Sequence, residues 1–329
     1  MFNIITFGSA TRDIFLRSKD FKIIDGADFV SGKALALDAG SKIYIDDLIF
    51  ATGGGGTNSA ATFALQGLKT AYAGLIGDDV GGKEILKELE NLKISTEFVK
   101  TTSKAKTPYS IILSAGAERT ILVYEGASHL LDKNGIDWGK IKKSKWFYVS
   151  GLSGKSSEVF EPLVNFAAEN KIKLAVNPGR DQLTKDLAVL KKLLSKIDIL
   201  IVNQEEASVI TGIDFKNEEE LFKKFDEFVP GIAVMNKGAQ GAAISDGQNI
   251  YRAGIPESGY LDRTGAGDAF GSGFVAALIN GKGLEEAIQL ATANATSCVQ
   301  QIGAKNGLLR KGEWGEWKKV KVNMEQLLK

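Results

Sequence analysis

Residues 261–274 read LDRTGAGDAFGSGF, in which a Gly-Ala-Gly turn precedes an apolar stretch typical of a helix. The first turn of a helix presents unpaired backbone N–H groups and the positive end of the helix dipole, and glycine lets a bound anion approach closely. Gly265, Ala266 and Gly267 therefore predict an anion site. Asp268 follows directly, and we expect it to stay ionised and to accept a proton from a hydroxyl held beside that anion. This pairing suits phosphoryl transfer, whereas the alternative is that Asp268 only caps the helix.

Six short apolar runs predict buried strands, because each is bounded by polar or glycine-rich residues. They are NIITFG, TAYAGLIG, KWFYVS, KIKLAVN, IDILIVN and GIAVMNK. Stretches with apolar residues at helical spacing lie between them, including TNSAATFALQGL and GLEEAIQLATANATSCVQ. Strands that alternate with helices predict an α/β fold of three layers, in which helices cover both faces of a mostly parallel central sheet.

Two extended segments, 29–50 and 107–124, interrupt this alternation and indicate a small separate sheet. We expect the strands of this sheet to come from about 13–50 and 99–125. The chain has no internal repeat, no low-complexity linker and only 5 prolines, so residues 1–329 predict a single domain. A chain of this length buries roughly three quarters of its unfolded surface, which gives an ample core.

The composition excludes several kinds of protein. The 41 basic and 40 acidic residues leave a net charge of +1, which argues against nucleic acid and against a membrane surface as partners. The N-terminal residues lack the pattern of a signal peptide and no apolar run reaches the ~18 residues of a membrane span, so we expect a cytoplasmic protein. A lone cysteine, Cys298, excludes an intrachain disulfide, and a lone histidine, His129, excludes a two-histidine metal site.

A second glycine motif, GGGGTNSAATFALQGLKTAYAGLIGDD, occupies residues 53–79. Together with the motif at 261–274 it resembles the ribokinase-like (PfkB) carbohydrate kinase family, whose early pattern matches here at Gly54, Asn58, Ala60, Gly67 and Gly77. The similarity extends to NQEE at 203–206, NKGAQGA at 236–242 and QIGA at 301–304. Two motifs in the right order are more specific than either glycine cluster alone.

The resemblance implies a ribokinase-like sandwich with the small sheet as a lid over the acceptor. It also implies that Asp268 deprotonates an acceptor hydroxyl, while the N–H groups of 265–268 stabilise the transferring phosphate of ATP. Asp13, Gly54, Gly55 and Asn58 match the positions that bind the sugar, for which short carboxylate and amide groups are suited. The alternatives are that Asp13 is a solvated loop acid and that Asn58 is a helix N-cap.

Asn203 and Glu206 follow a predicted strand and resemble the element of the family that organises magnesium and phosphate. Mg²⁺ prefers oxygen ligands and keeps several waters, so Glu206 is expected to hold it directly or through water. The alternative is an N-cap with an acid in the first helical turn, and both interpretations are compatible.

The resemblance assigns the nucleotide to Asn236, Gly238 and Gly241, and to Asn294, which is expected to flank the adenine from the last long helix. A requirement for a monovalent cation such as K⁺, and a homodimer formed through the lid, are further expectations. The sequence departs from the family pattern at Arg263, where relatives usually have a small residue such as threonine.

Together with the residues, the resemblance implies an ATP-dependent kinase that acts on a primary alcohol of an unphosphorylated sugar, such as ribose, fructose or a sugar acid. Relatives that use sugar phosphates, and ribokinases too, commonly have lysine where this chain has Gly55, and no cation occurs between Ala51 and Gly67. A nucleoside kinase of the same fold is the alternative acceptor class. A protein that senses a sugar or nucleotide without turnover is the alternative outside catalysis, although a sensor has no need of Asp268.

Overall fold

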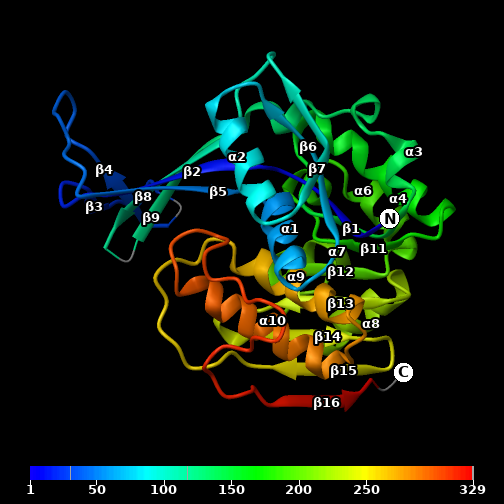
Figure 1. Ribbon diagram of the computed structural model, residues 1–329. Helices are drawn as coiled ribbons and strands as arrows, with labels where there is room; N and C mark the ends of the chain where they lie inside the picture. The colour runs from blue at the N-terminus through cyan, green and yellow to red at the C-terminus, as the bar shows by residue number, and fades with distance from the viewer. Residues whose placement is uncertain (30, 117, 328–329) are drawn as a thin grey trace.

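A computed structural model of the chain describes all residues except 30, 117, 328 and 329. Its centre is a ten-stranded sheet (Figure 1). In spatial order the strands are β16 (Val322–Gln326), β15 (Asn249–Ala253), β14 (Ala242–Ser245), β13 (Ile232–Asn236), β12 (Ile199–Asn203), β11 (Lys173–Val176), β10 (Ser144–Val149), β1 (Phe2–Phe7), β6 (Thr70–Gly77) and β7 (Ser95–Thr102). The seven from β13 to β7 are parallel, and they include all six strands that the apolar runs predict.

Alternate residues of these strands pack on opposite faces of the sheet, as a strand period of two requires. On β1, Ile5 and Phe7 join one core and Ile4 joins the other; on β10, Phe147 and Tyr148 divide in the same way. Several helices pack against the core that contains Ile5, Phe7 and Phe147: α3 (Trp138–Ile141), α4 (Phe160–Glu169), α6 (Leu187–Leu193), α7 (Gln204–Thr211) and α8 (Glu218–Phe228). Helices α1 (Gly55–Leu65), α9 (Ala266–Ile279) and α10 (Leu284–Val299) cover the other face, with α2 (Val80–Asn91) beside α1. The predicted three-layer α/β fold is confirmed.

A four-stranded sheet projects from this body, with strand order β5 (Asp47–Gly53), β2 (Thr11–Arg17), β8 (Tyr109–Ala115) and β9 (Glu118–Tyr124) (Figure 1). We call it the lid sheet. A hairpin of β3 (Lys22–Asp25) and β4 (Lys33–Ala36) extends beyond it. The expectation that lid strands begin at about residue 99 is wrong, because β7 pairs with β6 in the large sheet and the second lid segment begins at Tyr109.

Three antiparallel strands that the apolar pattern does not predict extend the large sheet beyond β13. The last of them, β16, pairs with β15, and Trp314 from the preceding segment packs on the core formed by α9 and α10.

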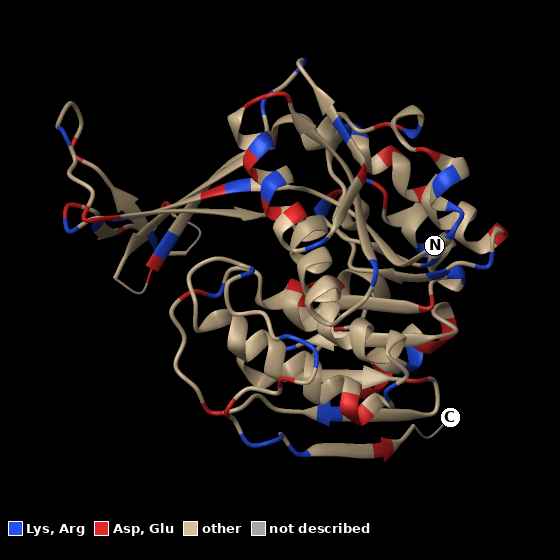
Figure 2. Cartoon of the chain, viewed as in Figure 1, with Lys and Arg blue, Asp and Glu red and all other residues tan. Residues whose placement is uncertain are grey.

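Among the described residues, no helix has the length and apolar character needed to cross a membrane. Basic and acidic residues are interspersed along the chain in the view of Figure 2.

The parallel strands bring their following loops to one edge of the sheet. Ser150 follows β10, Arg180 begins α5 (Arg180–Thr184) after β11, Asn203 ends β12, and Asn236 ends β13. In an open α/β sheet, ligands bind at this carboxyl edge. The glycine motifs at the starts of α1 and α9 also reach it, because Gly55 lies beside both Ser150 and Asp268.

Candidate active site

The site is built where α1 and α9 begin. Gly54 precedes α1 with φ of 93°, and Gly265 precedes α9 with φ of 81°, both in the region that favours glycine. A Cβ atom at Gly54 would lie 2.5 Å from the carbonyl oxygen of Ser9, and one at Gly265 would lie 2.3 Å from the Cβ of Ala304. Both turns are therefore restricted to glycine by backbone conformation and by close packing.

Asp268 and Asn58 join the two helix starts. The Asn58 Nδ2 group donates a hydrogen bond of 2.8 Å to Asp268 Oδ2, and Asn58 Oδ1 is buried without a partner among the residues that the structure describes. Neither residue is a cap, because Gly265 and Gly54 occupy the N-cap positions. Among the described residues no side chain caps α9, and the outer side of Gly267 is open, since a Cβ atom there would meet no other described group within 4 Å. The first turn is thus free to face an anion.

The pKa of Asp268 is raised by burial, and the hydrogen bond from Asn58 and the charge of Lys305 partly offset this rise. The simple expectation that a helix start keeps this acid ionised is therefore incomplete, because desolvation is the larger effect. A raised pKa brings a carboxylate closer to the value that suits a general base near neutral pH.

Asp13 lies in strand β2 and is 3% exposed, so it is not a solvated loop acid. Its Oδ1 atom accepts a hydrogen bond of 2.8 Å from the Thr11 hydroxyl. Burial raises the pKa of Asp13, against hydrogen bonds from Thr11 and Ser110 and the charges of Lys305 and Arg12. A buried carboxylate of this kind is available to hold hydroxyl groups of a ligand.

A cavity of about 470 Å³ lies between the loop after β13 and helices α9 and α10. Its lining includes Asn236, Gly238 and Gly241, three of the residues predicted to bind the nucleotide, and it reaches Ala266 and Gly267 in the anion turn. Asn236 Oδ1 is buried and has no hydrogen-bond partner in the described part of the chain. The largely apolar lining of this cavity, with a few polar groups, is suited to a planar base. We call this space the nucleotide cavity.

A second cavity of about 440 Å³ separates the lid sheet from the segment 260–263. Arg119 of β9 lines it and donates hydrogen bonds of 2.7 Å to Asp262 and 2.9 Å to Thr264, so it links the lid to the late glycine motif. Arg263, the departure from the family pattern, stacks on Tyr260 with 4.3 Å between its guanidinium carbon and the ring centre. Both Arg263 and Tyr260 line both cavities. We call the second space the lid cavity.

Asn203 and Glu206 form a reciprocal cap at the start of α7. Asn203 Oδ1 accepts from the Glu206 backbone N–H at 2.8 Å, and Glu206 Oε2 accepts from the Asn203 N–H at 2.9 Å. Burial raises the pKa of Glu206, and the nearby Glu205 raises it further. No cluster of three or more Asp, Glu, His or Cys side chains able to hold a metal occurs in the described part of the chain.

Comparison with known proteins agrees with this geometry. The pattern of the pfkB family carbohydrate kinases matches residues 4–311. The chain belongs to this family. A ribokinase of Haemophilus influenzae is 30% identical to this carbohydrate kinase over 268 residues, which are 78% of the chain and 84% of the relative.

Solved structures share the fold of this carbohydrate kinase. That of Arabidopsis thaliana ribokinase complexed with ribose and ATP has a TM-score of 0.75 at 21% identity, and the match covers 94% of this chain and 96% of that chain. The nucleoside kinase of Methanocaldococcus jannaschii has a TM-score of 0.74 at 19% identity, with 94% of this chain and 95% of that chain covered. At such identities the likeness concerns the fold.

The expectation that Asn294 flanks the nucleotide is corrected by the structure. Its side chain is fully buried; Nδ2 donates to the carbonyl oxygen of Ala269 at 2.8 Å, and Oδ1 accepts from the backbone N–H of Leu309 at 2.9 Å. The neighbouring Ala295 and Thr296 line the nucleotide cavity instead. Asn294 therefore ties α10 to α9 and to the C-terminal segment of the kinase.

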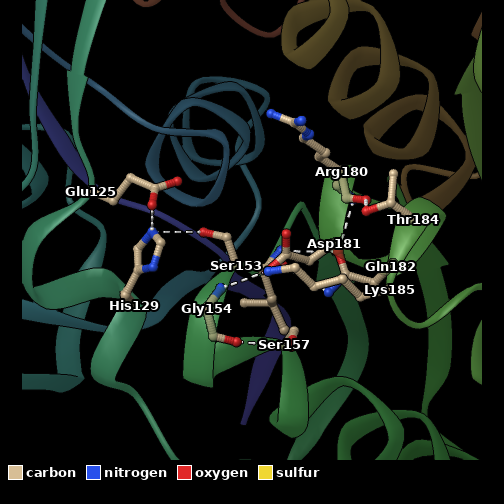
Figure 3. Close-up of polar contacts among 12 residues, drawn as sticks. Glu125, His129, Ser153, Gly154, Ser157, Arg180, Asp181, Gln182, Thr184 and Lys185 are labelled. Carbon is tan, nitrogen blue, oxygen red and sulfur yellow. Dashed lines mark hydrogen bonds and ion pairs between the residues drawn. The ribbon is translucent and has the colours of Figure 1, made fainter.

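The loops after β10 and β11 pack closely, since a Cβ at Gly151 would lie 2.8 Å from the Cα of Gly179. The Gly154 N–H donates to Asp181 Oδ2 at 2.8 Å, so the GLSGKSS sequence at 151–157 uses this group internally and does not form a phosphate loop. Arg180 begins α5, and its guanidinium extends away from the other labelled polar groups (Figure 3).

His129 is partly buried beside this loop (Figure 3). Its Nε2 atom lies 3.1 Å from the Ser153 hydroxyl and 3.0 Å from Glu125 Oε2. A serine–histidine–acid triad needs the acid on the other ring nitrogen, so this arrangement does not activate Ser153 in that way.

Sequence reasoning missed Lys305, which is buried close to the site and paired with Glu88 of α2 at 2.8 Å. A lysine in a polar, glycine-containing loop ordinarily predicts an exposed side chain. It also missed Arg119 as the link between the lid and Asp262, because the two residues lie far apart in the chain. No local signal identifies either contact.

Replacing Asn294 by alanine is predicted to destabilise the kinase by about 1–3 kcal/mol, because the buried Leu309 N–H and Ala269 C=O lose their partner. The KM for ATP should stay within about twofold of the wild type, because the side chain is absent from the nucleotide cavity. Ala295→Leu, which fills the cavity from the next position, is the matched control and should raise that KM with little change in Tm. A strong rise in the KM for ATP in Asn294→Ala at unchanged Tm would show instead that Asn294 contacts the adenine.

Proposed function

We propose that this carbohydrate kinase transfers the γ-phosphate of ATP to a primary alcohol of an unphosphorylated sugar, with Asp268 as the general base. The observation that carries the proposal is the hydrogen bond between Asp268 and Asn58 in the first turn of α9, which no described side chain caps and whose residues Ala266 and Gly267 line the nucleotide cavity. The complex of Arabidopsis ribokinase with ribose and ATP supports the same pair of reactants.

In this proposal Asp268 takes the proton of the acceptor hydroxyl as the oxygen attacks the γ-phosphorus, and ADP leaves with the electrons of the broken P–O bond. The N–H groups at 265–268 stabilise the negative charge on the transferring group, which is the main requirement of such a reaction. Asp13 and Asn58 hydrogen-bond to other hydroxyls of the sugar and orient it. The sensing alternative leaves the base at Asp268 without a purpose.

The nucleotide cavity is the proposed ATP site, with Asn236, Gly238 and Gly241 around the base and ribose and the anion turn at the phosphates. Mg²⁺ bound with ATP would neutralise charge on its phosphates. Glu206 fits a contact through water, because its Oε2 atom is engaged in the cap while Oε1 has no partner among the described residues. We assign no residue to a monovalent cation, so KCl is a variable of the assay.

Gly55 supports an unphosphorylated acceptor, because it places no cationic side chain in the site to bind a phosphate group of the acceptor. The position is also crowded: a Cβ there would lie 2.9 Å from Ser150 Oγ and 3.4 Å from Asp268 Oδ1. No lysine side chain is therefore presented from this position. Arg12 does not supply the missing charge freely, since its guanidinium donates to the Ala51 carbonyl at 3.2 Å and lies over Phe50. The lid cavity, with the apolar groups of Phe15, Leu16 and Ile49 in its lining, keeps a nucleoside as the second acceptor class.

A homodimer through the lid sheet is part of the proposal. β5 and β9 are its edge strands, and they expose Leu48, Phe50, Leu122 and Tyr124, each 50–56% accessible. Exposed strand edges with apolar side chains favour association with another chain. Light scattering distinguishes this dimer from a monomer.

Asp268→Asn is predicted to lower kcat by roughly 10²- to 10⁴-fold, the usual size of a general-base contribution, with the affinity for ATP within about threefold. Its Tm should rise, because burial raises the pKa of Asp268 and the ionised group therefore costs stability above the unfolded pKa. ADP release and thermal unfolding at neutral pH measure the two effects. Turnover close to that of the wild type would exclude Asp268 as the base.

Glu206→Gln is predicted to raise the Mg²⁺ concentration needed for half-maximal activity by about threefold or more, because an amide attracts the hydrated cation less than a carboxylate does. Glutamine preserves the cap to the Asn203 N–H, so Tm should change little. Glu205→Gln, at the exposed neighbouring position, is the control and should leave the Mg²⁺ titration unchanged. Equal titrations for both variants would leave Glu206 with a structural role only.

The acceptor is tested by kcat/KM for ribose, fructose, 2-keto-3-deoxygluconate, adenosine and inosine against fructose 6-phosphate and fructose 1-phosphate, with and without KCl. We expect an unphosphorylated compound to lead. A preference of more than about tenfold, or ~1.4 kcal/mol of transition-state free energy, for either sugar phosphate would overturn the interpretation of Gly55. Adenosine or inosine as the best acceptor would select the nucleoside class.

A further inference from the structure

Lys305 is a buried cation with two partners from distant segments. Its side chain is 5% exposed, and Nζ donates to Glu88 Oε2 at 2.8 Å and to Thr52 Oγ1 at 2.5 Å. The Thr52 hydroxyl also contacts Glu88 Oε2, so the three groups form a closed network. A lysine is almost never buried without a charged partner, because desolvation of its ammonium is costly.

The network lies against the proposed acceptor site. Thr52 belongs to β5 just before the Gly54 turn, and β5 pairs with β2 so that Ala51 lies opposite Asp13. Gly303, two residues before Lys305, packs near Ala51, since a Cβ at Gly303 would lie 3.3 Å from that of Ala51. Lys305 lies in the segment that follows α10, and its contacts with Thr52 and Glu88 link β5 to α2 beside the proposed acceptor site.

Glu88 is not the only carboxylate whose charge acts on Lys305. Packing brings Lys305 toward both aspartates, because the adjacent Ala304 packs on Gly265, three residues before Asp268, and Gly53, next to Thr52, lies against Asp13. The negative charges of Asp13 and Asp268 raise the pKa of Lys305 against the lowering by burial, and its positive charge lowers theirs. Three carboxylates thus act on one ammonium in a poorly solvated region, and Arg12 of β2 adds a second positive charge that acts on Asp13. Like charges in such a region favour protonation of one of the acids unless a cation compensates them.

Four side chains interact with Asp268, and they come from α1, β10, α10 and the segment after α10. Asn58 of α1 is a neutral hydrogen-bond donor. Tyr148 of β10 has its pKa raised by burial, and burial together with the charge of Asp268 raises the pKa of Cys298 of α10 to about 12, so both are neutral in the working range. Lys305, from the segment after α10, supplies positive charge.

We propose that Lys305 is a positioning residue of the transfer reaction, whose ammonium keeps Asp268 and Asp13 charged and holds strand β5 in register with the acceptor site. This inference rests on the proposed role of Asp268 as the base. The buried Lys305–Glu88 ion pair would then have two functions: it joins α2 to the C-terminal segment, and its lysine sets the protonation states of Asp268 and Asp13.

The test is the pH profile of kcat/KM for the best acceptor from the panel. A base works only when deprotonated, so activity falls as the pH drops through its pKa, and a higher pKa moves this acid limb to higher pH. Lys305→Met should therefore lose at least about threefold more activity at the acid end of the profile than at its alkaline end. Lys305→Arg, which keeps the charge, should restore the position of the limb. A purely structural lysine would lower activity equally at all pH values.

Two further variants keep the test decisive. Thr52→Val removes the hydroxyl partner and keeps all charges, so its acid limb should coincide with that of the wild type. The double variant Lys305→Met with Glu88→Leu leaves no unpaired buried charge from this ion pair and is expected to fold, since apolar replacement of a buried pair is often neutral or stabilising. It should show the same displaced acid limb as Lys305→Met. A profile that overlays the wild type in both lysine variants overturns the proposal.

Asp268→Asn measured alongside separates the two levels of inference. If Asp268→Asn loses turnover while Lys305→Met keeps the profile of the wild type, the base assignment stands and the role of Lys305 is wrong. If Asp268→Asn retains turnover, both the proposed function and the inference about Lys305 are overturned.

Discussion

The hydrogen bond between Asn58 and Asp268 joins residues 210 positions apart and holds the starts of α1 and α9 against each other. This contact requires two turns without side chains, at Gly54 and Gly265, where a Cβ atom would meet the backbone of Ser9 and the Ala304 side chain. It also leaves the first turn of α9 without a side-chain cap among the described residues. An uncapped helix start beside a carboxylate is a stable arrangement only when the surrounding fold fixes both, because each alone is solvated more favourably by water.

The carboxylates of the site are costly for the fold. Burial raises the pKa of both Asp13 and Asp268, which means that their ionised forms destabilise the folded chain at neutral pH. Lys305 offsets part of this cost for both acids at once and is itself held by Glu88. The apolar packing of ten strands between two layers of helices supplies the stability that permits such a strained group of charges.

The two cavities differ in the parts of the fold that form them. The nucleotide cavity is formed by elements of the body alone, whereas the lid cavity needs the lid sheet on one side and residues 260–263 on the other. Tyr260 and the stacked Arg263 line both, at the junction between them. A bulky residue at the variant position of the glycine motif therefore contributes to the wall between the two cavities, and the Arg119–Asp262 pair bridges the lid to the same segment.

The sequence by itself determined the parallel strands, the helices between them and the glycine turns, because periodicity and turn chemistry are encoded within short stretches. The turn at 265–267 also singled out Asp268, whereas Asn58 and Asp13 were identified only through the resemblance to the kinase family, and the roles of all three stay proposals. Tertiary structure alone decided the antiparallel extension β14–β16, the placement of β7 outside the lid, the core role of Asn294 and the burial of Lys305. These features depend on partners far away in the chain, such as Glu88, 217 positions from Lys305. A polar side chain in a local pattern carries no mark of the distant group that will desolvate or pair with it.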